Sequence, residues 1–341
     1  MNGKERIEVP KPGDRVLWIR FVLFGDVLES LADAHNFKRR FPEIHLTFLT
    51  YPRYAEFVRT QPYIDDVLSG YKRFFREWRE LDLKIRAGRY KWLINNHVRG
   101  KTSLLALLRQ AERRIGSPSF FLFKFFHHMS VERFSRLCDV NINDRSLPSV
   151  FAAEEDRHTA VKLLAGLPER RLFAVIGASK VEKRWPEKGW IEFLRPLVNE
   201  GWGVVLNGHG PREEKIGRHI ESALASRNVL NLVGALDFAK MSGVISHCTL
   251  AIGNDTGPLH LAALGGVPTI GLFNHPAKAK AHLDLLNIPW FRALYADSHI
   301  PRAARGLPLG SLPSETVAHV FGAFEEEFLP KAFAWRDNSP R

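Results

Sequence analysis

The sequence has little cysteine and no long apolar run. Its 341 residues include 2 cysteines, Cys138 and Cys248, which lie far apart in apolar contexts. This excludes a disulfide framework, and both are expected to be reduced core residues. No stretch of about 18 apolar residues is present to span a bilayer. The starting segment MNGKERIEVPKPGD is polar and lacks the apolar core of a signal peptide, so a cytoplasmic location is expected.

Metal-ligand spacing is also missing. His127 and His128 are adjacent, and Glu132 nearby does not complete a ligand set. Neither cysteine has a partner at the spacing of a zinc site. The sequence therefore predicts no metal site.

Acidic residues are outnumbered by basic ones. The chain has 49 Lys and Arg against 37 Asp and Glu, a formal net charge of +12 at pH 7. Such a charge attracts polyanions, which include nucleic acid, an anionic membrane and a phosphorylated glycolipid. No zinc finger, helix-turn-helix or other reader motif accompanies the charge, so nucleic acid is not expected as a partner.

Strand-like and helix-like segments alternate along the chain, which is typical of parallel α/β units. The length suits two domains of about 150 residues. We expect an N-terminal domain over residues 1–160, a C-terminal domain over 161–330 and a tail at 331–341, with a boundary helix at 154–165. Strands are expected near residue 16, at 45–49, at 91–94, near 114, and in a second set between 171 and 273.

The segment from Leu250 to Phe273, LAIGNDTGPLHLAALGGVPTIGLF, predicts a strand, a turn, a short helix and a second strand. Asn254, Asp255 and Thr256 are all residues that can cap the helix start, and proline is tolerated in its first turn. Unpaired N–H groups at a helix start favour an anion, and Gly257 lets a ligand approach the backbone. His260, one turn on, can face the same ligand. The alternative is an ordinary capped helix between two parallel strands.

The order of these residues adds to that interpretation. The run DTGPLHLAALGGVPTIGLF resembles the donor-phosphate motif of the ADP-heptose:lipopolysaccharide heptosyltransferases. The chain departs at Leu264, where a third alanine is usual, and at Asn274, where a glycine is usual, and both lie beyond the helix start. The resemblance covers about residues 14–330. It implies that the donor diphosphate is held by Asp255, Thr256, Gly257 and His260.

An N-terminal segment also resembles the family. Residues 14–42 read DRVLWIRFVLFGDVLESLADAHNFKRRFP, and Val16 to Ile19 is apolar, as a strand buried on both faces should be. Asp26 follows this strand at the edge where open α/β sheets place ligands, although a helix cap would explain an aspartate there equally well. The resemblance implies that Asp26 is the general base. Residues 21–24 are bulkier than the small residues usual in this loop, which bears on the shape of the acceptor pocket.

A third segment, LFAVIGASKVEKRWPEKGW at residues 172–190, resembles the family pattern of a strand followed by G/H-A-[ST]-x-x-x-K-x-W-P. The resemblance implies that Lys183 reaches the donor diphosphate and that Ser179 supplies a hydroxyl. By composition, a lysine before a helix start is commonly solvated. Trp185 beside it indicates a packed loop instead.

A glycine-rich turn follows the next strand, in GVVLNGHGPREE at residues 203–214. The resemblance implies that an acidic residue after the turn contacts the ribose or the nucleotide. We assign Glu213, with Glu214 as the alternative. An exposed glutamate in a first helical turn also needs no function, because it favours the helix dipole.

The resemblance implies an α/β fold of glycosyltransferase-B type, in which two Rossmann-like domains face each other across a cleft. It further implies an inverting transfer of heptose from ADP-L-glycero-D-manno-heptose to an inner-core lipopolysaccharide acceptor, with a nucleotide-sugar co-substrate and no cofactor or metal. A last helix, expected at 314–328, would pack back toward the first domain as in relatives.

The basic residues are expected to serve the acceptor. Residues 71–90, YKRFFREWRELDLKIRAGRY, form the densest basic stretch, which is also typical of an amphipathic helix with a solvated face. The resemblance implies that such residues hold an anionic glycolipid at the inner leaflet. The Phe-rich run at 118–128 is either buried or in peripheral contact with the membrane. The assigned acceptor-binding residues are Lys72, Arg73, Arg76, His97, Arg99 and Lys101.

Other classes of function fit parts of the sequence. A glycosyltransferase of the same fold with another nucleotide sugar or another acceptor would share the architecture, because a fold does not fix a function. A nucleotide-sugar epimerase or hydrolase would consume the donor without any acceptor. A nucleic-acid-binding protein would be retained on DNA in a salt-dependent manner.

Overall fold

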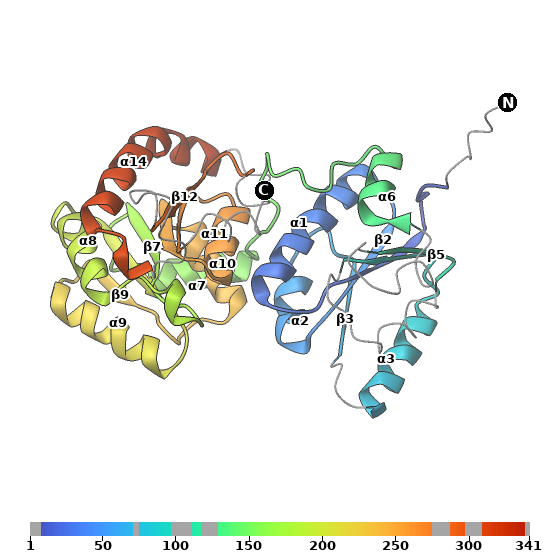
Figure 1. Ribbon diagram of the computed structural model, residues 1–341. Helices are drawn as coiled ribbons and strands as arrows, with labels where there is room; N and C mark the ends of the chain where they lie inside the picture. Colours follow the sequence, from blue (N-terminus) through green and yellow to red (C-terminus); the bar gives the residue numbers. More distant parts are fainter. Residues whose placement is uncertain are drawn as a thin grey trace. The chain divides into compact units, whose positions relative to one another are not determined.

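The computed structural model describes residues 8–70, 75–96, 111–116, 129–274, 287–296 and 309–337. The chain divides into two compact units, residues 1–144 and residues 145–341 (Figure 1). Each unit is built around its own parallel sheet. The two units are therefore described one at a time.

Unit 1 contains a six-stranded sheet in the order β3-β2-β1-β4-β5-β6, and every described pairing is parallel. The apolar residues of β1 are almost fully buried, as expected for a central strand covered on both faces. The strand order is that of a Rossmann fold. The strands are β1 (Arg15–Ile19), β2 (His45–Thr50), β3 (Asp66–Ser69), β4 (Trp92–Asn95), β5 (Arg113–Gly116) and β6 (Met129–Ser130).

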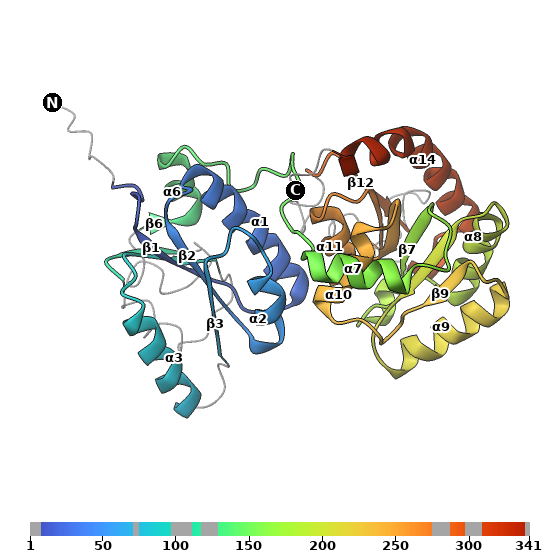
Figure 2. The same ribbon diagram turned by 180° about the vertical axis from the view of Figure 1, so that it is seen from behind.

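Helices cover both faces of this sheet. Its helices in the described residues are α1 (Phe24–Arg40), α2 (Pro52–Arg59), α3 (Phe75–Ala87) and α6 (Val131–Leu137), with α3 on the face opposite α1 and α2 (Figures 1 and 2). Successive β1 residues serve the two faces, because side chains alternate along a strand. Trp18 packs on Phe37 of α1 with ring centroids 5.6 Å apart, whereas Leu17 shares a core cluster with Leu81 of α3.

Unit 2 repeats the same topology. Its sheet has the order β12-β11-β10-β7-β8-β9, and every described pairing is again parallel. Read from β9, this is the strand order of unit 1. The expected α/β fold of two Rossmann-like domains is therefore confirmed at the level of the two sheets. The strands are β7 (Arg171–Val175), β8 (Gly203–Asn207), β9 (Val229–Asn231), β10 (Leu250–Asn254), β11 (Thr269–Phe273) and β12 (Phe291–Tyr295).

The helices of unit 2 fall into two groups. Helices α8, α9 and α14 lie on one face of the sheet, and α7, α10 and α11 lie on the other (Figures 1 and 2). Two short 3-10 turns, η1 (Val181–Lys183) and η2 (Leu309–Ser311), contact each other. The helices are α7 (Glu154–Leu163), α8 (Glu187–Asn199), α9 (Pro211–Leu224), α10 (Phe238–Ser246), α11 (Gly257–Leu264) and α14 (Ser314–Asp337).

The helix expected at the domain boundary belongs to unit 2. Helix α7 packs on α10, where a Cβ on Gly243 would collide with the carbonyl of Asp156. This close packing ties α7 to the second sheet, so the division falls after Asp144 rather than at residue 160. The packing of α7 on α10 therefore places this helix in unit 2.

Helix α14 packs on α8 within unit 2. Phe321 lies with its ring centroid 5.3 Å from that of Phe193 and 5.7 Å from that of Trp202. Arg292 donates from one nitrogen to both carboxylate oxygens of Glu327, at 2.9 and 3.0 Å. The helix begins at Ser314 as expected and runs on to Asp337. Packing of this helix against the first domain stays a prediction.

Both cysteines are buried, and neither forms a disulfide. Burial raises the pKa of Cys138 to about 12, as expected for a thiol inside a core. Over the ranges that the structure describes, no helix is long and apolar enough to cross a membrane. In the same ranges, no group of three His, Cys, Asp or Glu side chains is placed to hold a metal ion.

Candidate active site

The loop that follows β7 is tied to the end of β10 by Asn254. This side chain is fully buried, its Oδ1 accepts a hydrogen bond from Trp185 N at 3.0 Å, and its Nδ2 donates to the Ile176 carbonyl at 2.8 Å. Trp185 is anchored further by a 2.9 Å hydrogen bond from its Nε1 to the Leu312 carbonyl. Both strand ends lie at the edge of the sheet where open α/β folds bind ligands.

Helix α11 begins at Gly257 with Thr256 at its N-cap position. The Thr256 hydroxyl makes no capping bond and donates instead to the Asn254 carbonyl at 3.3 Å. The predicted strand, turn and helix are therefore present. The side chain at the N-cap position, that of Thr256, makes no hydrogen bond to the start of the helix. The amide end of the helix dipole is left facing the turn, which favours an anion there.

Asp255, Lys183 and His260 form one buried cluster at this helix start. Asp255 Oδ2 forms an ion pair with Lys183 Nζ, and Asp255 Oδ1 lies 3.5 Å from His260 Nε2. Lys183 Nζ also lies 3.4 Å from the Asp255 carbonyl oxygen. Asp255 thus contacts two other residues assigned to donor binding, Lys183 from a distant part of the sequence and His260 from the first turn of α11.

The electrostatics of the cluster favour the Asp255 carboxylate. Burial by itself would raise the pKa of Asp255. The hydrogen bond and charge of His260, together with the ammonium of Lys183, outweigh burial and hold this pKa well below its usual range. The cluster therefore carries a fixed negative charge between two basic side chains, and the outward cation, Lys183, keeps 21% of its side chain exposed.

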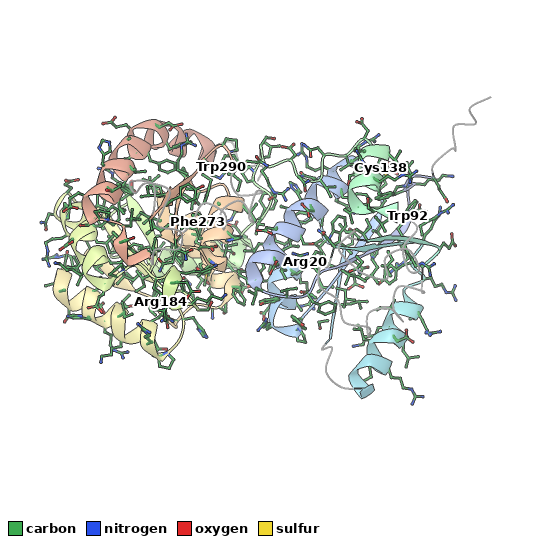
Figure 3. The ribbon with its side chains drawn as sticks, in the orientation of Figure 1. Arg20, Trp92, Cys138, Arg184, Phe273 and Trp290 are labelled. Carbon is green, nitrogen blue, oxygen red and sulfur yellow. The ribbon has the colours of Figure 1, made fainter. Side chains whose placement is uncertain are left out.

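Arg184 points to the other side of the same loop and was not singled out from the sequence. Figure 3 labels Arg184. Its Nε donates to the Ala178 carbonyl at 2.6 Å, and its terminal nitrogen lies 3.2 Å from Glu213 Oε1. Lys183 ends the 3-10 turn η1, whereas Arg184 follows it in extended backbone, and the two side chains reach different carboxylates. No sequence spacing links Arg184 to Glu213, because the contact forms only in the folded unit.

The two glutamates considered at the start of α9 have different surroundings. Glu213 is buried, and its Cγ lies near Gly177, where an added Cβ would approach it to 3.2 Å. Glu214 instead packs on Gly234, after β9. Glu213 is therefore the one that faces the loop of the Lys183 cluster. Ser179 lies exposed in that loop.

A cavity of about 510 Å³ lies beside the Arg184–Glu213 pair. Its walls come from η1, the start of α8 and the first turns of α9, and they include the basic side chains of Arg212 and Lys215. Glu187 contributes one acid, which is paired with His219. The balance of charge on the walls is basic.

In unit 1, Asp26 lies in the first turn of α1. Its Oδ2 accepts a 3.3 Å hydrogen bond from Leu23 N, as a first-turn acid commonly does for the residue that caps a helix. Its Oδ1 forms a 3.0 Å ion pair with Arg20, which was not singled out from the sequence. With 32% of its side chain exposed, Asp26 is held on two sides and still open to solvent.

The loop between β1 and α1 is strained. Val22 has φ of 118°, a region that a β-branched residue rarely adopts. Its carbonyl accepts hydrogen bonds from Arg53 at 3.3 Å and from the Tyr54 hydroxyl at 3.4 Å, and the neighbouring Leu23 is exposed. The bulky residues of this loop thus differ in exposure, since Phe21 and Phe24 are buried while Leu23 faces solvent.

Most of the assigned acceptor residues lie in segments that the structure does not describe. Arg76 lies near the start of α3. The Phe-rich run at 118–128 and the other assigned acceptor residues lie outside the described residues. Those residues are Lys72, Arg73, His97, Arg99 and Lys101, and all six acceptor assignments stay predictions.

Comparison with known proteins decides what kind of enzyme this is. Residues 122–283 match the family model described as glycosyltransferase family 9 (heptosyltransferase). This range holds the Lys183 cluster and the Arg184–Glu213 pair. The chain carries a glycosyltransferase family 9 domain.

Curated relatives align with most of the chain and agree with this assignment. The chain is 27% identical to lipopolysaccharide heptosyltransferase 1 of Pseudomonas aeruginosa over 76% of this chain and 78% of that protein. It is 22% identical to lipopolysaccharide core heptosyltransferase OpsX of Haemophilus influenzae over 79% of this chain and 82% of that protein. Both alignments cover more than the family model does.

Solved structures share the fold of this glycosyltransferase. A family 9 glycosyl transferase from Veillonella parvula superposes with a TM-score of 0.78 at 20% identity, over 94% of this chain and 99% of that one. The E. coli heptosyltransferase WaaC with ADP superposes with a TM-score of 0.68 at 20% identity, over 93% of this chain and 99% of that one. At such identity the likeness speaks for the fold alone.

Proposed function

We propose that this glycosyltransferase transfers a heptose from ADP-heptose to an inner-core lipopolysaccharide acceptor with inversion at the anomeric carbon. The observation that carries the proposal is the Lys183–Asp255–His260 cluster at the start of α11. The curated relatives are lipopolysaccharide heptosyltransferases, and ADP and an ADP-heptose analogue are bound by solved relatives of the same fold.

The diphosphate of the donor is assigned to the start of α11. An anion there would meet the helix dipole, the Gly257 amide and the ammonium of Lys183, whose side chain is the most exposed of the cluster. Asp255 fixes Lys183 and His260 in place. As the sugar leaves, negative charge grows on the β-phosphate, and preorganised cations at that point stabilise it. Ser179 and Thr256 are assigned hydroxyl contacts to the same group.

The nucleoside is assigned to the basic cavity beside Arg184 and Glu213. Glu213 is buried at the start of α9, and Arg184 holds it by an ion pair. A ribose hydroxyl can donate to a carboxylate, which is how acidic residues after the second strand of Rossmann folds recognise nucleotides. The volume of about 510 Å³ leaves room for a base and a sugar.

Asp26 is assigned as the general base. The acceptor hydroxyl oxygen forms a bond to the anomeric carbon while the bond from that carbon to the β-phosphate oxygen breaks, and ADP departs with the electron pair. The hydroxyl proton goes to the Asp26 carboxylate. Attack on the face opposite ADP inverts the anomeric configuration. No metal is needed in this scheme, since cationic side chains and a helix start neutralise the leaving group.

The acceptor is proposed to be an anionic glycolipid. The net charge of +12 favours an acceptor that carries phosphate or carboxylate groups. Lys72, Arg73, Arg76, His97, Arg99 and Lys101 are the proposed contacts. A cytoplasmic location with peripheral contact to the inner leaflet is the matching proposal for where the enzyme acts.

A donor panel tests the proposal. Thermal shift and calorimetry against ADP-, UDP- and GDP-sugars should give stabilisation by ADP-heptose above the others, and a clear preference for a uridine donor would overturn the assigned donor. Lys183→Met should lose this stabilisation. Consumption of donor in the absence of any acceptor would instead indicate an epimerase or a hydrolase.

A base variant tests the mechanism. Asp26→Asn should keep the fold and the donor-induced shift but lose transfer, because the amide cannot accept the hydroxyl proton. Asp66→Asn, an exposed change in β3 of the same unit, is the matched control and should keep full activity. Near-normal turnover by Asp26→Asn would refute the base assignment.

A further inference from the structure

Arg20 is a buried arginine placed directly behind the proposed base. It follows β1, keeps 9% of its side chain exposed, and pairs with Asp26 Oδ1 at 3.0 Å. The second terminal nitrogen of Arg20, the residue labelled in Figure 3, donates to the carbonyl of Asn96, just after β4. The guanidinium thus spans two adjacent strand ends and the first turn of α1.

The Asn96 end of this contact is itself anchored. The Asn96 side-chain amide donates to Asp33 Oδ2 at 2.7 Å and to the Ser30 hydroxyl at 3.2 Å, and both acceptors lie on α1. Trp18 Nε1 donates to the same Ser30 hydroxyl at 2.9 Å. The carbonyl that holds Arg20 is therefore fixed to the helix that carries Asp26.

We propose that Arg20 is a positioning residue for the transfer reaction: it holds one oxygen of Asp26 so that the carboxylate meets the acceptor hydroxyl in a fixed orientation. The role rests on the proposed function of Asp26 as general base. With one oxygen held by Arg20 and the other accepting from Leu23 N, the carboxylate cannot rotate freely, and its exposed lone pairs face solvent.

The geometry calls for arginine rather than lysine. A guanidinium presents several donors in a rigid plane and can bind Asp26 and the Asn96 carbonyl at once, whereas an ammonium is a point charge. Arg20→Lys therefore keeps the charge and loses part of the orientation. Arg20→Ala removes both and leaves a space of guanidinium shape.

Steady-state kinetics of the full-length enzyme tests this role. Arg20→Ala should lower kcat on the order of 10- to 100-fold, because small displacements of a catalytic group have effects of that size. The KM values for donor and acceptor should stay unchanged, since Arg20 is buried and acts through Asp26. Arg20→Lys should fall between Arg20→Ala and the unsubstituted enzyme.

Chemical rescue separates positioning from a merely structural role. Guanidinium chloride at non-denaturing concentration should restore part of the lost kcat of Arg20→Ala by refilling the space, which it would not do for a misfolded protein. Arg171→Ala is the matched control, because Arg171 is half-buried and its guanidinium donates to the carbonyls of His247 at 3.4 Å and Leu167 at 3.5 Å, not to a carboxylate. It should show no response to guanidinium.

The outcomes distinguish this role from the proposed function. If Asp26→Asn is inactive while both Arg20 variants turn over normally, the positioning role fails and the base assignment stands. If Asp26→Asn turns over normally, both fail together. If Arg20→Ala does not fold, Arg20→Lys decides, and a kcat equal to that of the unsubstituted enzyme overturns the role.

Discussion

Asp255→Asn should destabilise unit 2 strongly. The substitution removes the negative charge that faces Lys183 and His260, and the Asp255 and His260 side chains are only 4% and 3% exposed. Removing one partner of a buried ion pair costs about 3–5 kcal/mol because the remaining charge is left buried. Lys183 keeps 21% exposure and can turn toward water. We therefore expect a cost near the lower end, about 3 kcal/mol.

The cost should depend on pH. The pKa of Asp255 is held below its usual range in the folded state, since His260 and Lys183 outweigh the effect of burial. A carboxyl with a lowered folded pKa contributes stability that is fully present above its unfolded value, about 3.9, and is lost as the pH falls toward the folded value. The difference between the wild type and Asp255→Asn should therefore shrink as the pH falls below about 4.

Calorimetry of the full chain between neutral pH and pH 3 measures both effects. For a unit of this size about 3 kcal/mol corresponds to a Tm lowered by about 6–12 °C. Asp237→Asn is the control, because Asp237 caps α10 through a 2.8 Å bond from Lys240 N, and asparagine caps a helix as well as aspartate does. A neutral-pH Tm of Asp255→Asn equal to that of the control would refute the reasoning.

Three further changes test packing, titration and strain. Phe321→Ala should lower the free energy of unfolding by about 3–5 kcal/mol, because it leaves a cavity where α14 packs on α8. The exposed substitution Val161→Ala is the control, and a urea midpoint of Phe321→Ala no lower than that of this control would contradict the prediction. Burial, followed by the charge of Arg39, lowers the pKa of His35 to about 4. The free energy of unfolding should therefore decrease as the pH falls from about 6.5 to 4, and it should decrease less in His35→Phe. The same pH dependence in both proteins would contradict this assignment to His35. Val22→Gly should raise the free energy of unfolding by about 1 kcal/mol, because glycine adopts a positive φ freely, and a lowered midpoint would show that the loop is unstrained.

Local patterns predicted the parts of the fold that depend on local physics. The strands expected near residue 16, at 45–49, at 91–94 and near 114 are present as β1, β2, β4 and β5, and the turn before α11 lies where its cap residues placed it. The edge strand β3 was missed, because its four residues are only partly buried and lack a strong apolar pattern. Sequence patterns report burial, and edge strands have little of it.

Contacts between distant segments were not predictable in the same way. Asn254 joins β10 to the loop after β7, and Arg184 reaches Glu213, yet neither pair follows from spacing. Lys183 and Asp255 were both expected at the diphosphate, but the ion pair between them was not. A partner across a sheet edge is fixed by strand order, which a single sequence leaves open.

The two units contain ion pairs at equivalent places in their sheets, and the burial of the paired residues differs. In each, a basic residue after the first strand of the sheet pairs with a carboxylate beside a helix start: Arg20 with Asp26, and Lys183 with Asp255. The difference lies in which partner faces solvent. Arg20 is the buried member of its pair, at 9% exposure against 32% for Asp26, whereas Asp255 is the buried member of the other, at 4% against 21% for Lys183. An exposed carboxylate can take a proton from a substrate, and an exposed ammonium can meet a phosphate. The reversed burial is the physical reason to assign proton transfer to Asp26 and anion binding to Lys183.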